Sequence, residues 1–295
     1  MTDHLVIAGL GFTGRAIAIA ARDSGMRVTA TTRDPAGKHA PPGIALIGFA
    51  AAGPAIAAAT HLVVTAAPAE TGDPVLTQHR AALDAAAGLR WIGYCSTTGV
   101  YGDHQGGTVD EATIPTPGSD RTRRRVACER AWMTLADRRA IDCLRLAGIY
   151  GPGRSAFDDL RRGTARRIDK PGHRFSRIHV TDIARATLAA MATAGQSSRI
   201  FNLSDDEPAS SASVTAYAAA LLGMDPPPLI GFEDAKASLS PMALSFWGES
   251  RVVRSAATKA TLGLSWRYPS YREGLTAILQ AERGTLNPGN GPDFR

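Results

Sequence analysis

The sequence predicts an α/β protein built on a doubly wound parallel sheet, with a smaller part contributed by the C-terminal half of the chain. Three observations lead to this fold class. Short apolar runs alternate with helical stretches over the first 150 residues, a glycine-rich turn joins the first run to the first helical stretch, and this alternation loosens after Gly151. Strands that alternate with helices favour βαβ units and a parallel sheet, whose crossovers are right-handed almost without exception.

The first half contains six short apolar runs that we expect to be strands. They lie at residues 5–8, 28–31, 45–47, 62–66, 91–95 and 143–146. Between them, residues 16–24 and 80–87 are rich in alanine and are predicted to be helices. The stretch SDRTRRRVACE at 119–129 predicts a further amphipathic helix with a very basic N-terminal half.

The second half is expected to return to the sheet once. The pattern predicts a strand at 177–180, a helix at 182–191, a strand at 200–203 and a helix at 213–222. We therefore divide the chain into a core at 1–150, rejoined by about 177–205, and a smaller part at 151–176 and 206–283. Residues 284–295 are polar and rich in glycine and proline, which predicts a disordered tail.

The composition indicates a cytoplasmic globular protein. The chain has 295 residues, 44% of them hydrophobic and 20% charged, and it begins MTDH, without the basic start of a signal peptide. No apolar run approaches the length of a membrane span. The three cysteines, Cys95, Cys128 and Cys143, suit neither a disulfide framework nor zinc. We therefore expect buried thiols in a reducing compartment, no metal site and no membrane partner.

The net charge of +6 favours a negatively charged partner. Most of the positive charge is arginine scattered along the chain, with clusters at 121–125 and 161–167. The sequence has no basic stripe interleaved with aromatic residues, no RNA-recognition signature and no zinc-finger spacing. Small anions are therefore favoured over nucleic acid, while a solvated arginine-rich surface explains many of these side chains equally well.

The segment LVIAGLGFTGRAIA contains Gly9, Gly11 and Gly14 in the spacing G-x-G-x-x-G. It directly follows an apolar strand and directly opens a helix, which is the context that a dinucleotide-binding turn requires. In such a turn the first glycine permits the tight bend, the second lets the backbone approach a pyrophosphate, and the third lets the helix pack close to the strand. We therefore expect a Rossmann domain that holds a dinucleotide, with Phe12 and Thr13 beside the glycines.

The end of the second strand bears on which dinucleotide is bound. An acid at this point would bind the adenosine ribose, whereas an arginine can fork onto a 2′-phosphate. The strand ends in Thr32 and Arg33, and Asp34 comes one position later, where we expect it to face away in a turn. The sequence therefore favours NADP(H) over NAD(H), with Thr32, Arg33 and Ala67 among the cofactor contacts. The alternative is that Arg33 is only a surface residue after a strand.

Four further segments carry a resemblance to a known family. They are CSTTGVYGD at 95–103, LRLAGIYGPGR at 144–154, RIHVTDIARA at 177–186 and FNLSDDEP at 201–208. With the glycine loop, they resemble the NAD(P)-dependent epimerase/dehydratase family, the extended short-chain dehydrogenase/reductases. The resemblance runs from about residue 5 to residue 208. It implies a doubly wound sheet whose ligands sit at the carboxyl ends of the strands, and a smaller C-terminal part that binds the substrate.

The resemblance also implies catalytic positions. A serine or threonine before the V-Y-G segment polarises a substrate oxygen, and Thr97 occupies that place with Ser96 beside it. The alternative is a strand-end hydroxyl that bonds only backbone. A tyrosine and a lysine four residues apart are implied on the next helix, but the sequence has Arg121 and Arg125 there. The chain therefore resembles the atypical branch of the family, which lacks the tyrosine.

Arginine cannot replace the tyrosine, because its pKa above about 12 keeps it protonated near neutral pH. Arg125 can still bind the ribose or a phosphate of the cofactor, and Arg121 can hold an anionic substrate. The alternative for both is a solvated basic helix face. Tyr150 and His104 are the remaining candidates for the catalytic proton.

The basic segment at 154–177 lies where the resemblance places the substrate. Arg154 and Arg174 are its predicted substrate contacts, together with Arg121. Phosphorylated or nucleotide-linked compounds would suit such a segment.

Two functions remain open at this point. The first is an NADP(H)-dependent oxidoreductase or epimerase-like enzyme that acts on an anionic carbonyl or hydroxyl compound, sugar nucleotides included. The second is a non-catalytic module that binds NADP(H) and reports redox state to a partner. The resemblance also implies a homodimer through helices that flank the core. The basic half of the 119–129 helix works against that dimer.

Overall fold

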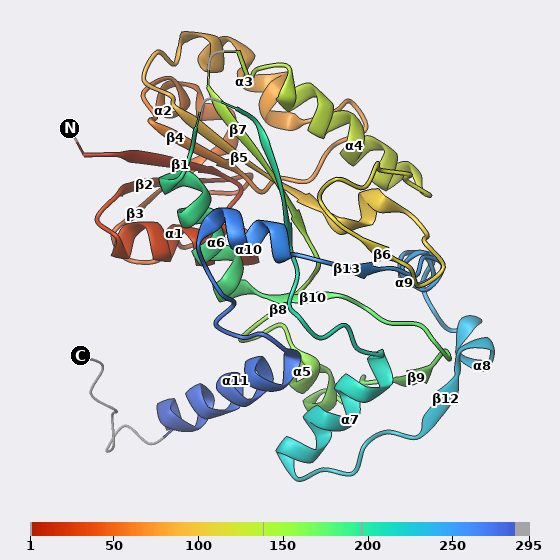
Figure 1. The fold of residues 1–295 in the computed structure, drawn as a ribbon. Coiled ribbons are helices and arrows are strands. Elements are labelled where there is room, and N and C mark those ends of the chain that lie inside the picture. The colour runs from red at the N-terminus through yellow and green to blue at the C-terminus, as the bar shows by residue number, and fades with distance from the viewer. Residues whose placement is uncertain (1, 138, 196, 287–295) are drawn as a thin grey trace.

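The computed structural model describes residues 2–137, 139–195 and 197–286, and a seven-stranded parallel sheet lies at its centre (Figure 1). The strands lie in the order β11-β7-β5-β4-β1-β2-β3, and every neighbouring pair is parallel. They are β1 (His4–Ala8), β2 (Arg27–Thr32), β3 (Ile44–Gly48), β4 (His61–Val64), β5 (Trp91–Thr97), β7 (Ala140–Leu146) and β11 (Arg199–Leu203). The prediction of a doubly wound α/β fold is confirmed.

The strand order reverses between β1 and β4, and this reversal fixes the place of the site. The chain runs outward through β2 and β3 on one side, and through β5, β7 and β11 on the other. In open α/β sheets, ligands bind in the crevice outside the carboxyl ends of the strands at such a reversal. The turns that follow β1 and β4 are therefore the expected walls of a ligand site.

Helices cover both faces of the sheet (Figure 1). One face carries α1 (Phe12–Asp23), α6 (Val180–Ala192) and α10 (Ala256–Leu262), and the other carries α2 (Gly53–Ala57), α3 (Pro74–Ala85) and α4 (Asp120–Met133). Alternate residues of a strand point to opposite faces, so β5 serves both hydrophobic clusters. Trp91 and Cys95 pack into the cluster that holds Ile17 of α1, and Tyr94 packs into the cluster that holds Trp132 of α4.

The remaining elements form the smaller part, drawn below the sheet in Figure 1. Its helices are α5 (Ala156–Arg161), α7 (Ser211–Leu222), α8 (Phe232–Lys236), α9 (Pro241–Trp247) and α11 (Tyr271–Leu286). Three short parallel pairs lie outside the central sheet: β8 (Gly148–Tyr150) with β10 (Arg177–His179), β9 (Arg167–Asp169) with β12 (Leu229–Gly231), and β6 (Thr108–Val109) with β13 (Val252–Val253). Of these, the β6–β13 pair joins the smaller part to the core. Two 3-10 turns, η1 (Phe49–Ala51) and η2 (Thr98–Tyr101), follow β3 and β5. A separate cluster that includes Phe157, Tyr271 and Leu275 holds α5, α7 and α11 together.

The C-terminal end differs from the prediction. The disordered tail was expected to start at residue 284, but α11 continues through Leu286, so the prediction is wrong for residues 284–286. The helix persists because Leu275, Ile278 and Leu279 anchor its first turns in the cluster of the smaller part. The rest of the predicted tail, 287–295, lies outside the described residues. Within the described ranges, no helix combines the length and the apolar character needed to cross a bilayer.

Candidate functional site

A cavity of about 1210 Å³ lies at the carboxyl ends of the central strands. Its walls come from the turns after β1, β2 and β4, from the end of β5, and from the segments around β8 and α9. Ligand pockets typically have volumes of about 300–1,000 Å³. This cavity therefore has room for a large cofactor together with a second compound.

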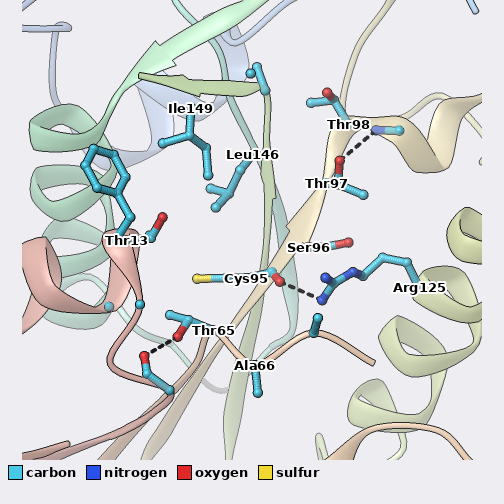
Figure 2. A pocket seen from close by; sticks show the side chains of 18 of the residues that line it. Thr13, Thr65, Ala66, Cys95, Ser96, Thr97, Thr98, Arg125, Leu146 and Ile149 are labelled. Atoms are coloured by element: carbon cyan, nitrogen blue, oxygen red, sulfur yellow. Dashed lines mark hydrogen bonds between the residues drawn. The ribbon is translucent and has the colours of Figure 1, made fainter. Parts of the chain in front are cut away.

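Two threonines from different strands hold the glycine loop in shape. Gly9 has φ of +111°, a conformation that favours glycine. Its N–H donates to Thr31 Oγ1 at 3.0 Å, and its carbonyl accepts from Thr65 Oγ1 at 2.6 Å (Figure 2). The roles of Thr31 and Thr65 were not predicted, because each depends on a strand that is distant in sequence.

The other two glycines have different surroundings. A Cβ at Gly14 would collide with the carbonyl oxygen of Gly9, whereas a Cβ at Gly11 would meet nothing within 4 Å. Gly11 begins α1 without a side-chain cap, so the first N–H groups of this helix remain available. Free amides, a positive helix end and open space at Gly11 are what a dinucleotide pyrophosphate requires. The described residues therefore fit an NAD(P) cofactor, and Phe12, Thr13 and Ala67 also line the cavity.

The turn after β2 is positively charged. Thr32 and Arg33 line the cavity, and Arg33 is exposed with no acceptor within the described ranges. Asp34 accepts two backbone N–H groups of its own turn, at 3.2 and 3.0 Å, and so faces away from the ligand position as expected. Lys38, which the sequence analysis did not single out, lines the same end of the cavity. Two cations that follow β2 thus line the cavity.

Thr97 and Ser96 are neighbours in sequence but differ in their hydrogen bonds. Ser96 is buried, and its hydroxyl donates to the carboxylate of Glu129 on α4. Thr97 Oγ1 accepts from the N–H of Gly99 at 3.1 Å, which leaves its own proton for another acceptor (Figure 2). Thr97 is therefore the hydroxyl of this pair that can contact a substrate oxygen, while Ser96 is engaged in the protein.

Arg125 reaches from α4 to the edge of β5 (Figure 2). Its Nη1 donates to the hydroxyl of Tyr94 at 2.9 Å and to the carbonyl of Cys95 at 3.0 Å. Its Nε and Nη2 meet no acceptor among the described residues, and the side chain lines the cavity. Burial raises the pKa of Tyr94, although Arg125 works against that shift, so Tyr94 stays neutral. Arg125 is thus a fixed positive group with two nitrogens left for a ligand.

Arg121 does not face the same way as Arg125. Its guanidinium lies 4.9 Å from the centre of the Phe246 ring, so α4 contacts α9 at the wall of the cavity. Phe246 is 47% exposed despite its apolar ring. No pattern in the sequence pointed to Phe246, because α9 is a short helix that is more than 100 residues away from α4 along the chain.

Neither Tyr150 nor His104 is placed to supply a proton. Tyr150 lines the cavity, but its hydroxyl donates to the carbonyl of Ser270 at 3.2 Å, and burial raises its pKa. His104 is absent from the cavity wall, and its Nε2 lies 3.1 Å from the carbonyl oxygen of Tyr101. Cys95 does line the cavity, but burial raises the pKa of its thiol to about 12. The roles of Tyr150 and His104 in proton transfer thus stay predictions, and the contacts of both side chains argue against them.

The charged side chains on the wall of the cavity are almost all positive. Of the described residues that form it, eight are arginine or lysine, and Glu249 is the only carboxylate. Glu249 is itself paired with Arg251 at 2.8 Å. The predicted contacts Arg154 and Arg174 are both exposed on this wall, and Arg154 stacks 5.6 Å above the Phe12 ring. The described residues contain no group of three or more His, Cys, Asp or Glu that could hold a metal ion.

Comparison with known proteins supports the fold. No family model matches the chain. Protein YeeZ of Escherichia coli K12 is 29% identical over 178 residues, a match that covers 60% of this chain and 58% of YeeZ. A solved structure described as a functionally unknown conserved protein from Silicibacter pomeroyi DSS is 43% identical, with a TM-score of 0.88 over 95% of this chain and 99% of that one.

More distant structures share the same architecture. The human epimerase family protein SDR39U1 aligns with a TM-score of 0.71 at 19% identity, over 94% of this chain and 99% of that one. MoeE5 aligns with a TM-score of 0.75 at 20% identity, over 96% of this chain and all of that one. The chain thus has the fold of the NAD-dependent epimerases and dehydratases, as the resemblance implied. More particularly, it belongs to the same family as the Silicibacter protein, whose function is stated to be unknown.

Proposed function

We propose that the protein binds NADP(H) along the glycine loop and acts on an anionic carbonyl or hydroxyl compound. The observation that carries this proposal is the cavity wall, where a dinucleotide cradle and eight cationic side chains line a single space. SDR39U1 was solved with NADPH, and MoeE5 with UDP-glucuronic acid and NAD, so this fold accommodates either cofactor. Arg33 and Lys38 favour the phosphorylated one.

The chain's own residues have distinct tasks in this proposal. The N-terminus of α1 and Gly11 hold the pyrophosphate, while Arg33 and Lys38 hold the 2′-phosphate. Thr97 donates a hydrogen bond to the reacting oxygen of the substrate, and Arg125 orients the ribose or a nearby anion. A bound nicotinamide supplies or accepts the hydride.

Proton transfer is the step for which the wall has no suitable side chain. Among the described lining residues, Tyr150 and Cys95 have pKa values raised by burial, and the remaining ionisable groups are cations or the paired Glu249. Water therefore exchanges the proton, and turnover is slow, because a positioned acid or base contributes about 10²–10⁴-fold. The same observation favours the second candidate function, a redox-reporting module that binds NADP(H) without turnover.

The preference for NADPH over NADH tests the cofactor binding that both candidate functions share. In a calorimetric titration we expect NADPH to bind more tightly than NADH. Arg33→Ala should weaken NADPH binding by about 10–100-fold, the value of one charge-assisted contact, and leave NADH nearly unchanged. Arg27→Ala is the matched control, since it removes the same charge from the opposite end of β2.

Two outcomes contradict the proposal. Equal losses for both cofactors would show that Arg33 does not read the 2′-phosphate. Failure of the wild type to bind either cofactor would remove both candidate functions. If NADPH binds, its oxidation by members of a panel of anionic ketones and aldehydes separates the enzyme from the module.

A further inference from the structure

A second cavity of about 370 Å³ adjoins the cofactor cavity between α5, α7 and α11. We call it the annex, the space enclosed by Ser155, Arg166, Arg177, Thr215 and Tyr271. Tyr150, Arg154 and Arg177 line both cavities, so the two spaces share a wall. The annex therefore lies directly beside the cavity that would hold the cofactor.

The arginines of the annex fall into two groups. Arg162 is paired with Asp159 at 2.6 Å, and Arg166 donates to the hydroxyl of Ser238 at 2.6 Å. Arg154 makes no hydrogen bond with its guanidinium among the described residues. Arg154 and Arg177 are therefore the cations of the annex with capacity for a ligand.

Arg177 is only partly satisfied by the protein. Its Nη1 donates to the carbonyls of Phe175 at 2.9 Å and Ala209 at 2.8 Å. Within the described ranges its Nε and Nη2 meet no acceptor. Three hydrogen-bonding N–H groups of a guanidinium thus remain beside the two cavities.

The nearby carboxyl of Asp205 does not neutralise Arg177. Asp205 is 2% exposed, and among the described residues no side chain donates a hydrogen bond to its carboxyl, although the backbone N–H groups of Arg177 and Glu207 act to lower its pKa. Burial raises its pKa to about 8, with Arg177 lowering it only in part. A carboxyl that holds its proton near neutral pH compensates the charge of Arg177 less than an ionised one would. A buried charge that is only partly compensated is costly, and an anion in the annex would offset that cost.

We propose that the annex is a phosphate-binding subsite in which Arg177 and Arg154 hold the anionic end of the substrate. This inference rests on the proposed function and narrows its substrate class to phosphate monoesters with hydroxyl groups. The annex is also lined by Asp158, which accepts from the N–H and the hydroxyl of Ser155, and by Asp159, which is paired with Arg162. These carboxylate oxygens and the hydroxyl of Thr215 suit the hydroxyl groups of a polyol skeleton. The reacting carbon would lie on the other side of the shared wall, in the cofactor cavity.

The first test fills the annex. NADPH-saturated protein is titrated with ribose 5-phosphate, and with ribose as the uncharged control. Val214 of α7 lines the annex, so Val214→Trp should weaken ribose 5-phosphate binding at least tenfold. Ala220 lies on the exposed side of the same helix, so Ala220→Trp is the matched control and should bind as the wild type does. Melting temperature and NADPH affinity, measured on both variants, show that each is folded.

The outcomes separate this inference from the function on which it rests. The proposed role of the annex alone is overturned if ribose 5-phosphate binds equally to both tryptophan variants, or if it does not bind to wild type that is saturated with NADPH. If the wild type does not bind NADPH, both the role of the annex and the proposed function are overturned.

The second test uses the protonation of Asp205. Sulfate is the probe, because its charge does not change between pH 7 and 9. We expect it to bind about five- to tenfold more weakly at pH 9, where ionised Asp205 compensates Arg177 and competes with the ligand. The charged or titratable groups around Asp205 and Arg177 are Tyr150 on β8, Asp206 next in the chain and Tyr271 on α11.

Two variants show whether Asp205 causes the pH dependence of sulfate binding. Asp205→Asn should abolish the pH dependence of sulfate binding. Asp206→Asn should retain it, because Asp206 is already paired with Lys259 at 2.6 Å. The proposal that Arg177 binds the anion would be overturned by either of two results. The first is a wild-type sulfate affinity that does not change with pH, and the second is a pH dependence that remains in Asp205→Asn.

Discussion

At the scale of single residues, Arg121 and Arg125 lie one turn apart on α4 and make different contacts. Arg125 is held at the edge of β5, because its Nη1 donates to the hydroxyl of Tyr94 and to the carbonyl of Cys95. Arg121 instead stacks on Phe246 of α9. A guanidinium is well suited to both tasks, since it can form several hydrogen bonds in one plane and also stack on a ring.

Beneath these side chains lies a buried ion pair that holds α4 to the sheet. Glu129 of α4 accepts from Ser96 and is paired with Arg145 of β7 at 2.8 Å. The side chains of Glu129 and Arg145 are 7% and 3% exposed. Arg145 also lies over the ring of Tyr101 at 4.8 Å. The network therefore joins α4, β5 and β7 directly below the predicted catalytic threonine.

Glu129→Gln should destabilise the protein by about 3 kcal/mol or more, because it leaves the buried charge of Arg145 unpaired. Urea unfolding of the wild type and the variant measures the change. The control is Asp120→Asn, which breaks the exposed pair with Arg123 on the same helix and should leave stability unchanged. A Glu129→Gln variant as stable as that control would show that the pair contributes nothing.

At the scale of elements, α1 and the loop before it depend on two glycines for different reasons. Gly14 lets the helix lie against the carbonyl of Gly9, while Gly11 leaves space on the ligand side. The loop is then held by Thr31 of β2 and by Thr65 after β4. Its shape is thus determined by three strands together.

Alanine substitutions distinguish the packing role of Gly14 from the role of Gly11 in leaving space for the ligand. Gly14→Ala should lower the melting temperature, because its methyl group pushes α1 away from the loop. Gly11→Ala should leave the melting temperature nearly unchanged but abolish most NADPH binding, since its methyl group occupies space meant for the pyrophosphate. Thermal unfolding and calorimetry on both variants provide the comparison. Similar stability losses in both variants would contradict the packing role of Gly14.

At the scale of the whole molecule, the buried carboxyl of Asp205 couples stability to pH. Its pKa is raised by burial from 3.8 to about 8 in the folded protein. Between these values the unfolded chain has released the proton and the folded protein still holds it. The free energy of unfolding therefore falls as pH rises from about 4 to 8, and levels off above that range.

Asp205→Asn should remove this part of the pH dependence. We expect the variant to be more stable than the wild type at pH 8 by an amount of order a few kcal/mol, and by much less at pH 5. Urea unfolding at the two pH values measures the difference, with Asp206→Asn as the exposed control. A constant difference between Asp205→Asn and the wild type at pH 5 and pH 8 would contradict the assigned pKa.

The sequence by itself determined the alternation of strands and helices, the parallel sheet that this alternation favours, and the glycine loop. These features depend on local patterns: apolar runs of strand length, helical stretches between them, and three glycines at fixed spacing. The helix expected at 119–129 is also present, as α4, and Ser119 caps its start through residues within one turn. Local signals of this kind remain readable without knowing which segments meet.

Only the tertiary structure decided which side chains share the site. Lys38, Phe246 and Arg177 reach one cavity from segments far apart in the chain, and no spacing in the sequence relates them. Tertiary contacts also bring the hydroxyl of Ser96 to Glu129 and that of Tyr150 to the carbonyl of Ser270, which no local pattern indicates. The physical reason is that burial and hydrogen bonding set the availability and the pKa of a side chain, and both depend on the neighbours that folding brings to it.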